Sequence, residues 1–289
     1  MIETSYHPPQ HEPLQFFRFL SRYFNRHNRI FIQDTDNRRI ESFVELVKTM
    51  KPLFLLLLLP FVTNGQNKTT SPGKVSFGLN FSPDYCYRTL KSDGSVSSNF
   101  IVDTREDLEI AQFGYTGGIS ICVDLSKRIA LETGFQYSNK GYKTRPQGLY
   151  YAQPSGPPGT IEFFYDFKYL SIPLKARCIL GNSKARFVAA VGMTTNFLIE
   201  AAETARREYP DGSYRNTKQS STPTFNRVDI AAIVSTGISY KMTQRTEFVG
   251  EPTFRYSLLK VKDAPVTEHL WNIGLNVGVY YRLHSRAKK

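Results

Sequence analysis

From residue 75 to residue 283, apolar residues alternate with small or polar ones, and this period of two constrains the fold more than any other feature. In the first segment, Val75, Phe77, Leu79 and Phe81 alternate with Ser76 and other small residues. Such a period places each kind of side chain on its own face of a β-strand. The pattern recurs in eight segments, over 75–82, 113–125, 129–137, 170–180, 187–197, 228–240, 248–258 and 271–283. The sequence therefore predicts an all-β fold of about eight strands.

The connections between these segments alternate in length. Three are short, over 126–128, 181–184 and 241–245, whereas three are long, over 89–112, 142–162 and 202–225; the connection over 260–268 is intermediate. Outer-membrane barrels have tight turns at the periplasmic end and long loops at the extracellular end. The alternation predicts a closed antiparallel up-and-down transmembrane β-barrel.

The composition of the two strand faces predicts which one meets the membrane. One face is apolar and rich in Phe and Tyr, and the other consists mainly of Gly, Ser, Thr and Asn. A soluble barrel turns its apolar face inward and has a charged exterior, but small residues suit a crowded interior better than a solvated surface. We therefore expect the apolar face to contact lipid, with aromatic residues near the strand ends as interface anchors, namely Tyr115, Tyr137, Tyr240, Tyr256, Trp271 and Tyr281.

Several charged residues share the inward face. Because an unpaired charge in the interior would be costly, opposite signs are expected to pair there. A narrow eight-stranded barrel has room for little beyond its own side chains, which favours a structural ionic plug over an ion pathway or a catalytic cluster. The predicted interior charge network comprises Glu132, Lys175, Arg177, Glu247, Glu251 and Arg255.

The N-terminal part of the chain predicts export. Residues 50–65 have a basic start, a short apolar core and a small residue before Gln66, as in a cleavable signal peptide. The apolar core is too short to span a bilayer. Residues 1–49 precede this signal, and we interpret them as an upstream extension outside the fold, with translation starting at Met50; a functional basic amphipathic arm is the alternative. The barrel domain is predicted over residues 66–289.

Charge and cysteine content exclude several classes of protein. The net charge is +12, and about +10 of it falls after residue 65. No Lys/Arg block or zinc spacing accompanies this charge, so we favour anionic lipid, including lipopolysaccharide, over nucleic acid as the partner. Cys86, Cys122 and Cys178 are widely separated within apolar runs, which indicates buried or lipid-facing thiols and neither a disulfide framework nor a metal site. Cofactor motifs are also absent from the sequence, since the Gly-rich run at 114–118 lies within a predicted strand.

One motif points to a known family. Residues 169–175, Tyr-Leu-Ser-Ile-Pro-Leu-Lys, resemble the "YLxIPLL" signature of the PorT-like outer-membrane β-barrel family of Bacteroidota. Weaker similarities lie at 131–141, at 250–252 and at 274–281, so the resemblance covers residues 75–283. It implies an exported integral outer-membrane protein without a cofactor, some of whose relatives assist secretion or gliding. Six residues after Leu283 depart from the aromatic end common in these barrels.

Three functions are compatible with the sequence. The first is a non-enzymatic barrel whose outer loops bind an envelope partner or a surface ligand, and it is the one we favour. The second is a lipid-modifying barrel enzyme, for which His269 beside Glu268, with Ser257 on the preceding strand, is the nearest approach to a triad; a chance surface histidine explains this arrangement better, and His284 follows the barrel. The third is a narrow pore.

Overall fold

A computed structural model describes residues 75–149 and 159–283. The predicted extension over 1–49 and signal peptide over 50–65 lie outside the described residues. Within the described part, no helix is both long enough and apolar enough to cross a membrane.

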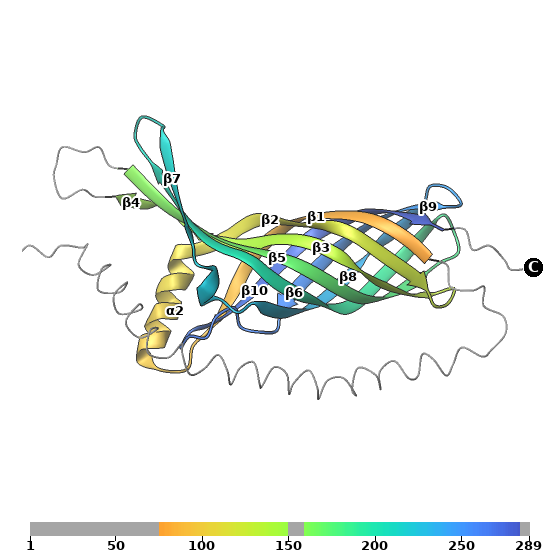
Figure 1. The fold of residues 1–289 in the computed structure, drawn as a ribbon, viewed down its shortest axis with the longest axis horizontal. Coiled ribbons are helices and arrows are strands. Elements are labelled where there is room, and N and C mark those ends of the chain that lie inside the picture. Colours follow the sequence, from red (N-terminus) through yellow and green to blue (C-terminus); the bar gives the residue numbers. More distant parts are fainter. Residues whose placement is uncertain (1–74, 150–158, 284–289) are drawn as a thin grey trace, which may run out of the picture. The chain divides into compact units, whose positions relative to one another are not determined.

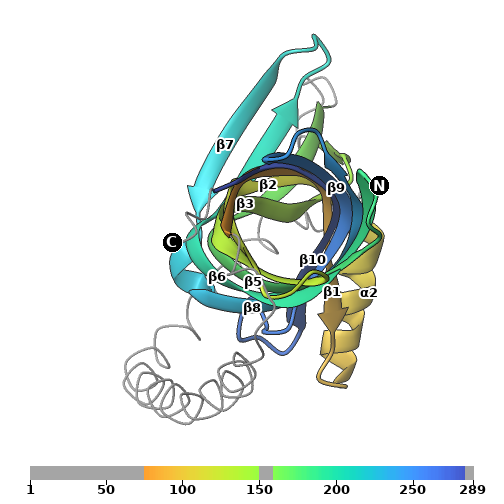
Figure 2. The ribbon, with the colours of Figure 1, turned by 90° about the vertical axis from the view of Figure 1, so that its right-hand side faces the viewer.

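Eight antiparallel strands close into a ring, as the alternating pattern predicts (Figures 1 and 2). Each ring strand pairs with its neighbour in the chain order, and the first and last strands pair from Ser76↔Arg282 to Lys91↔Thr267. Closure satisfies the backbone hydrogen bonds of every strand, which the hydrocarbon core of a membrane requires. The ring strands are β1 (Val75–Lys91), β2 (Glu109–Asp124), β3 (Ile129–Thr144), β5 (Gly159–Leu180), β6 (Ala185–Glu208), β8 (Val228–Lys241), β9 (Thr246–Ser257) and β10 (Thr267–Arg282).

The apolar face of the ring points outward, and the small polar face points inward. On β1, Phe77, Leu79 and Phe81 are exposed, whereas Asn80 and Ser82 are buried. The other ring strands repeat this distribution, so the exterior is a continuous apolar belt. Such a surface is stable in hydrocarbon and would aggregate in water. The predicted orientation of the two faces is confirmed.

Aromatic residues gather at the outer edge of this belt. Trp271 on β10 lies 6.4 Å from Tyr85, 6.0 Å from Tyr87 and 6.3 Å from Phe254, measured between ring centroids. Tyr115 and Tyr137 form a further pair at 6.0 Å. An aromatic girdle of this kind marks the membrane interface of an outer-membrane barrel.

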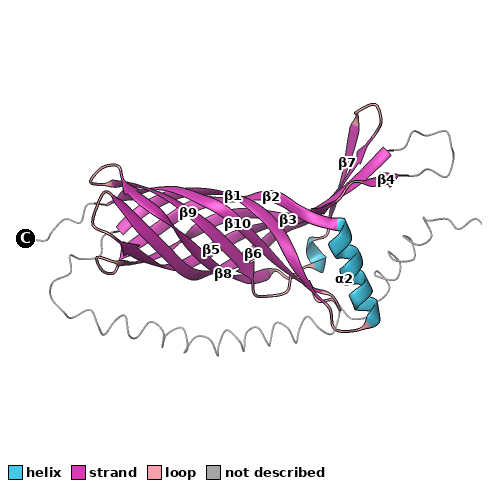
Figure 3. Cartoon of the chain, turned by 180° about the vertical axis from the view of Figure 1, so that it is seen from behind, coloured by secondary structure: helices cyan, strands magenta, loops and turns pink. Residues whose placement is uncertain are grey.

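The three short turns lie together at one end, as predicted, but the long connections contain structure that the alternating pattern did not predict. The first holds helix α2 (Val96–Leu108), whose N-cap Ser95 accepts a hydrogen bond from the Ser98 amide at 3.2 Å. The others extend β5 and β6 beyond the ring and add β4 (Gln147–Leu149) and β7 (Tyr214–Ser220), with a 3₁₀ turn at Thr222–Thr224. Figure 3 shows these additions at one end of the barrel.

All three cysteines are free thiols. Cys86 and Cys122 are buried, and Cys178 is exposed on the lipid-facing side. This distribution confirms the prediction of buried or lipid-facing thiols.

Candidate functional site

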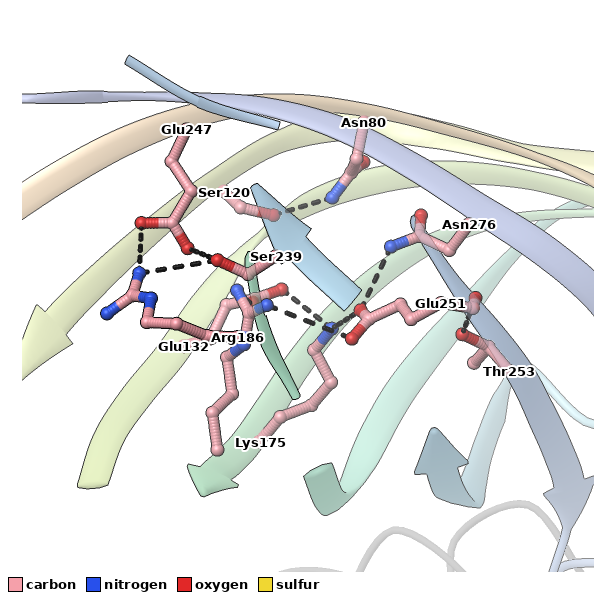
Figure 4. A network of polar contacts seen from close by, with 11 residues as sticks. Asn80, Ser120, Glu132, Lys175, Arg186, Ser239, Glu247, Glu251, Thr253 and Asn276 are labelled. Atoms are coloured by element: carbon pink, nitrogen blue, oxygen red, sulfur yellow. Dashed lines mark hydrogen bonds and ion pairs between the residues drawn. The ribbon is translucent and has the colours of Figure 1, made fainter. Parts of the chain in front are cut away.

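Four of the six predicted interior charges form one cluster, which Figure 4 shows in part. Glu132 on β3 accepts from Arg177 Nη1 at 2.7 Å and forms an ion pair with Lys175 Nζ at 2.7 Å, both on the neighbouring β5. Lys175 Nζ also lies 3.3 Å from Glu251 Oε1. Because β5 and β9 are not neighbours in the ring, this last ion pair crosses the barrel interior. Glu132 and Glu251 are both 0% exposed, and Lys175 and Arg177 are each 4% exposed, so the whole cluster is buried.

The other two predicted residues belong to separate groups. Arg255 Nη1 lies 3.4 Å from the Asp84 carboxylate on β1, and Asp84 also accepts from the Ser82 and Thr116 hydroxyls at 2.6 Å each. Glu247 lies near the short turns, where its carboxylate pairs with Arg186 at 2.6 Å. The structure thus divides the predicted network among three levels.

A glycine makes the Asp84 site possible. A Cβ atom on Gly274 would lie 1.9 Å from Asp84 Oδ1 and 2.5 Å from Ser82 Oγ. Since Gly274 pairs with Asp84 in the β1–β10 ladder, the carboxylate occupies the space that a side chain on β10 would fill. Asp84 is 1% exposed.

Two further charged groups in the upper half of the barrel were missed by the sequence analysis. Asp229 accepts from Asn196 and from Ser257 at 2.8 Å each and lies 3.7 Å from Lys140 Nζ. Lys140 and Asp229 occupy inward-facing positions in the alternating pattern of their strands, so that pattern could have identified them.

The second missed group lies at the rim beside α2. Arg105 of the helix pairs with Glu109 at 2.8 Å and with Glu268 at 3.1 Å, and Arg88 Nε donates to Glu109 at 2.7 Å. Burial raises the pKa of Glu268, and the Arg105 guanidinium opposes that rise. Arg105 lies on a helix, so the alternation along the strands does not apply to it, and no sequence signal indicated its position.

An apolar cluster occupies the mouth of the barrel beside these ion pairs, and its Tyr142 hydroxyl accepts from Arg105 at 2.9 Å. Its members are buried and come from β3, β5, β6 and β10 and from the segment before β10. Together with the charged levels it fills the interior with side chains, as expected for a ring of eight strands. The cluster comprises Tyr142, Phe167, Tyr169, Leu198, Ala201, Val261 and Leu270.

The residues considered for a catalytic triad do not assemble. The Ser257 hydroxyl is buried and donates to Asp229, and Glu268 is buried beside Arg105. His269 lies on the opposite face of β10 and stacks on Tyr256 with ring centroids 6.0 Å apart. Among the described residues, its polar contact is the backbone oxygen of Ser257, at 3.1 Å. The imidazole and the two other groups therefore face different sides of the barrel wall. His284 lies outside the described residues.

Beyond the rim, β5 and β6 continue as the centre of a four-stranded sheet with order β4-β5-β6-β7. β6 last pairs with β8 at Phe197 and from Ala202 onward pairs with β7. β7 is exposed along its whole length. We call this structure, made of 147–149, 159–166, 202–208 and 214–220, the extracellular sheet, after the side on which we expect it, since the long connections of outer-membrane barrels face outward.

One face of the extracellular sheet is internally paired. Glu200 at its base accepts from Lys168 at 2.8 Å and from Lys218 at 2.5 Å, and these hydrogen bonds lower the pKa of Glu200 to about 2. The Arg206 guanidinium lies 4.8 Å from the Tyr214 ring centroid. The basic groups of this face therefore have partners on β6 or β7.

The opposite face carries two arginines without partners. Arg207 on β6 and Arg215 on β7 are directly opposed in the ladder. Within residues 75–149 and 159–283, neither guanidinium forms an ion pair. Like charges directly opposed across two strands destabilise a sheet, so folding alone does not account for this pair. Glu203, the acid on the same face of β6, lies nearer the rim, where burial raises its pKa.

Several solved outer-membrane proteins and one protein family match this chain. Neisserial surface protein A matches 74% of this chain and 100% of its own at 16% identity, with a TM-score of 0.41. The outer membrane protease OmpT from Escherichia coli matches 75% and 99% at 10% identity and 0.37, and OprG from Pseudomonas aeruginosa matches 75% and 98% at 10% and 0.36. No curated protein sequence matches the chain. The family model described as outer membrane protein beta-barrel domain matches residues 64–263, and the chain belongs to that family of bacterial outer-membrane proteins.

Proposed function

We propose that this protein is a non-enzymatic outer-membrane scaffold that binds an anionic ligand or partner through its extracellular sheet. The observation that carries the proposal is the opposed pair Arg207 and Arg215, which has no counter-ion among the described residues. Arginine offers several donors in a fixed fork that matches carboxylate, phosphate and sulfate groups. An anion bound between the two guanidiniums would offset the electrostatic repulsion between them.

The rest of the barrel supports a display role better than transport or catalysis. Charged and apolar side chains fill the interior at several levels, which favours a scaffold over a pore. His269, Ser257 and Glu268 lie on different sides of the wall, which disfavours the lipid-modifying alternative. A rigid barrel that holds a protruding sheet is a common arrangement for binding.

We also propose how the protein is exported and to which subgroup of outer-membrane barrels it belongs. A signal peptide over residues 50–65 would be removed before Gln66, and residues 1–49 would not be translated. The motif at 169–175 supports a place among PorT-like barrels of Bacteroidota, in which case the anionic partner belongs to the cell envelope or to a secreted protein. N-terminal sequencing of the protein purified from native membranes tests this: a first residue of Gln66 supports it, and any peptide from residues 1–49 contradicts it.

Binding of defined polyanions tests the function itself. The full mature barrel, reconstituted in nanodiscs, is titrated with dextran sulfate and with poly-L-glutamate, and affinity is followed by biolayer interferometry. In the variant R207Q/R215Q we expect affinity to fall at least tenfold for one of these polymers. The matched control is R206Q/K218Q, which removes two charges from the paired face of the same hairpin and should change affinity less than threefold. Equal losses in both variants, or no binding of either polymer by the wild type, contradict the proposal.

A further inference from the structure

The charges of the barrel are distributed unequally between its two ends. At the end with the extracellular sheet, the described residues over 88–112, 139–169, 198–229 and 258–268 contain fourteen basic and fourteen acidic residues. The interior clusters of Glu132, Lys175, Arg177, Glu251, Asp84 and Arg255 are also neutral in sum. The excess positive charge of the described residues therefore lies at the other end, where the short turns are.

That end has seven basic residues and two acidic ones. Both acids are engaged: Glu247 pairs with Arg186 at 2.6 Å and with Arg282 at 3.8 Å, and Asp124 lies 3.8 Å from Arg282. Among the described residues, Lys127, Arg128 and Lys184 have no ion-pair partner, and Arg245 reaches only the Tyr281 hydroxyl, at 3.5 Å. The basic residues are Lys127, Arg128, Lys184, Arg186, Lys241, Arg245 and Arg282.

Three of these basic residues occupy the same structural position. Arg128, Lys184 and Arg245 are each the last residue of a short turn, directly before β3, β6 and β9. Each offers its backbone carbonyl to an adjacent strand end, Arg128 to the Ile179 amide at 2.7 Å, Lys184 to Lys241 at 2.9 Å and Arg245 to Arg282 at 2.8 Å. These hydrogen bonds fix the backbone at each position, so the three charged side chains project from defined points before every second strand of the ring.

The apolar belt ends directly beside these positions. Leu180 is the last residue of β5, Leu125 and Met242 directly follow β2 and β8, and Ile129 and Phe187 lie at the start of β3 and β6; all are exposed. Exposed apolar residues next to an exposed cation match the boundary between acyl chains and headgroups, where Lys and Arg extend toward the polar layer. Short turns mark the periplasmic side of an outer-membrane barrel, so these cations face the phospholipid leaflet.

We propose that Arg128, Lys184 and Arg245 form a collar that binds anionic phospholipid headgroups in the periplasmic leaflet. The collar selects for the charge of the headgroup, because the apolar belt contacts the acyl chains of any lipid equally. Each basic residue near an anionic surface contributes about a fivefold gain in affinity, and the three together about a hundredfold. This inference does not depend on ligand binding by the extracellular sheet.

Native mass spectrometry of the full mature barrel in detergent tests the collar. The protein is titrated with phosphatidylglycerol and with phosphatidylcholine of identical acyl chains, for the wild type and for R128Q/K184Q/R245Q. We expect the wild type to prefer phosphatidylglycerol at least tenfold and the variant to lose that preference. Heat-modifiable gel migration establishes that the variant barrel is folded.

The matched control carries the same charge change at the opposite end. K91Q/R145Q/R227Q removes three exposed basic residues from the extracellular side, none of them in the Arg207–Arg215 pair, and should keep the full preference. Three results overturn the proposal: equal binding of the two lipids by the wild type, an unchanged preference in the turn variant, or an equal loss in the control.

Discussion

The Glu132 carboxylate, enclosed within the barrel, accepts a hydrogen bond from the Arg177 guanidinium at 2.7 Å while it also pairs with Lys175. Three charges of the central cluster therefore depend on one another, and the fourth, Glu251, joins them from β9 on the other side of the lumen. This arrangement explains how a ring of apolar exterior can contain so many ionisable groups.

Removing Glu132 should destabilise the barrel strongly. In Glu132→Ala the two cations stay buried with only Glu251 as an acid partner, and loss of one member of a buried pair costs about 3–5 kcal/mol. Urea unfolding in lipid vesicles measures the change. The control is Glu162→Ala, which breaks the more exposed Lys143–Glu162 pair and should cost less than about 1 kcal/mol. Similar values for the two variants would show that the central cluster has no special role in stability.

A methyl group on Gly274 should disrupt the Asp84 site. In Gly274→Ala the new Cβ would overlap Asp84 Oδ1, and overpacking of this kind costs about 1–3 kcal/mol. Gly250→Ala is the control on the adjacent strand, since its Cβ would meet nothing closer than 3.9 Å. The free energy of unfolding in vesicles is the readout. A Gly274→Ala barrel as stable as Gly250→Ala would contradict the close packing of β1 against β10.

The filled interior predicts the electrical behaviour of the protein. Because Glu132 and Glu251 are inaccessible to solvent, we expect planar-bilayer recordings of the wild type to show no stable conductance. The barrel reconstituted with Glu132→Ala serves as a comparison in which one plug residue is missing. Reproducible unitary steps from the wild type would restore the pore as the leading function.

Acid should loosen the base of the β6–β7 hairpin. The lowered pKa of Glu200, about 2 against an ordinary 4.5, means that its contribution is complete above pH 4.5 and is lost as the pH falls through about 2. Hydrogen exchange of the β7 amides between pH 5 and pH 2 should show protection that declines toward the acid end. In Glu200→Gln this decline should be absent, and an unchanged decline would assign the acid response to another group.

The sequence predicted the ring but not the additions to it, and the reason lies in burial. Ring strands such as β1 have one face in lipid and one in the interior, so their residues alternate. β7 is Tyr-Arg-Asn-Thr-Lys-Gln-Ser and is exposed on both sides, so no face requires apolar residues and no period exists. Helix α2 is also mostly exposed, so its sequence shows no apolar period either.

For the interior charges, the sequence predicted which side chains point inward but not which ones pair. Parity on each strand indicated that Arg255 and Glu251 point inward, and the structure places them there. The partner of Arg255 is Asp84, two strands away across Gly274. Such pairings depend on the register and tilt of the closed ring, which alternation within a single strand does not contain.

Cysteine labelling on intact cells determines the side of the membrane on which each end of the barrel lies. In a Cys178→Ser background, Asn216→Cys on β7 and Gln244→Cys in the β8–β9 turn are treated with a membrane-impermeant maleimide on intact cells. We expect rapid labelling at residue 216 and labelling at residue 244 only after the outer membrane is broken. Labelling of residue 244 on intact cells, with residue 216 protected, would contradict an extracellular sheet and a periplasmic collar together.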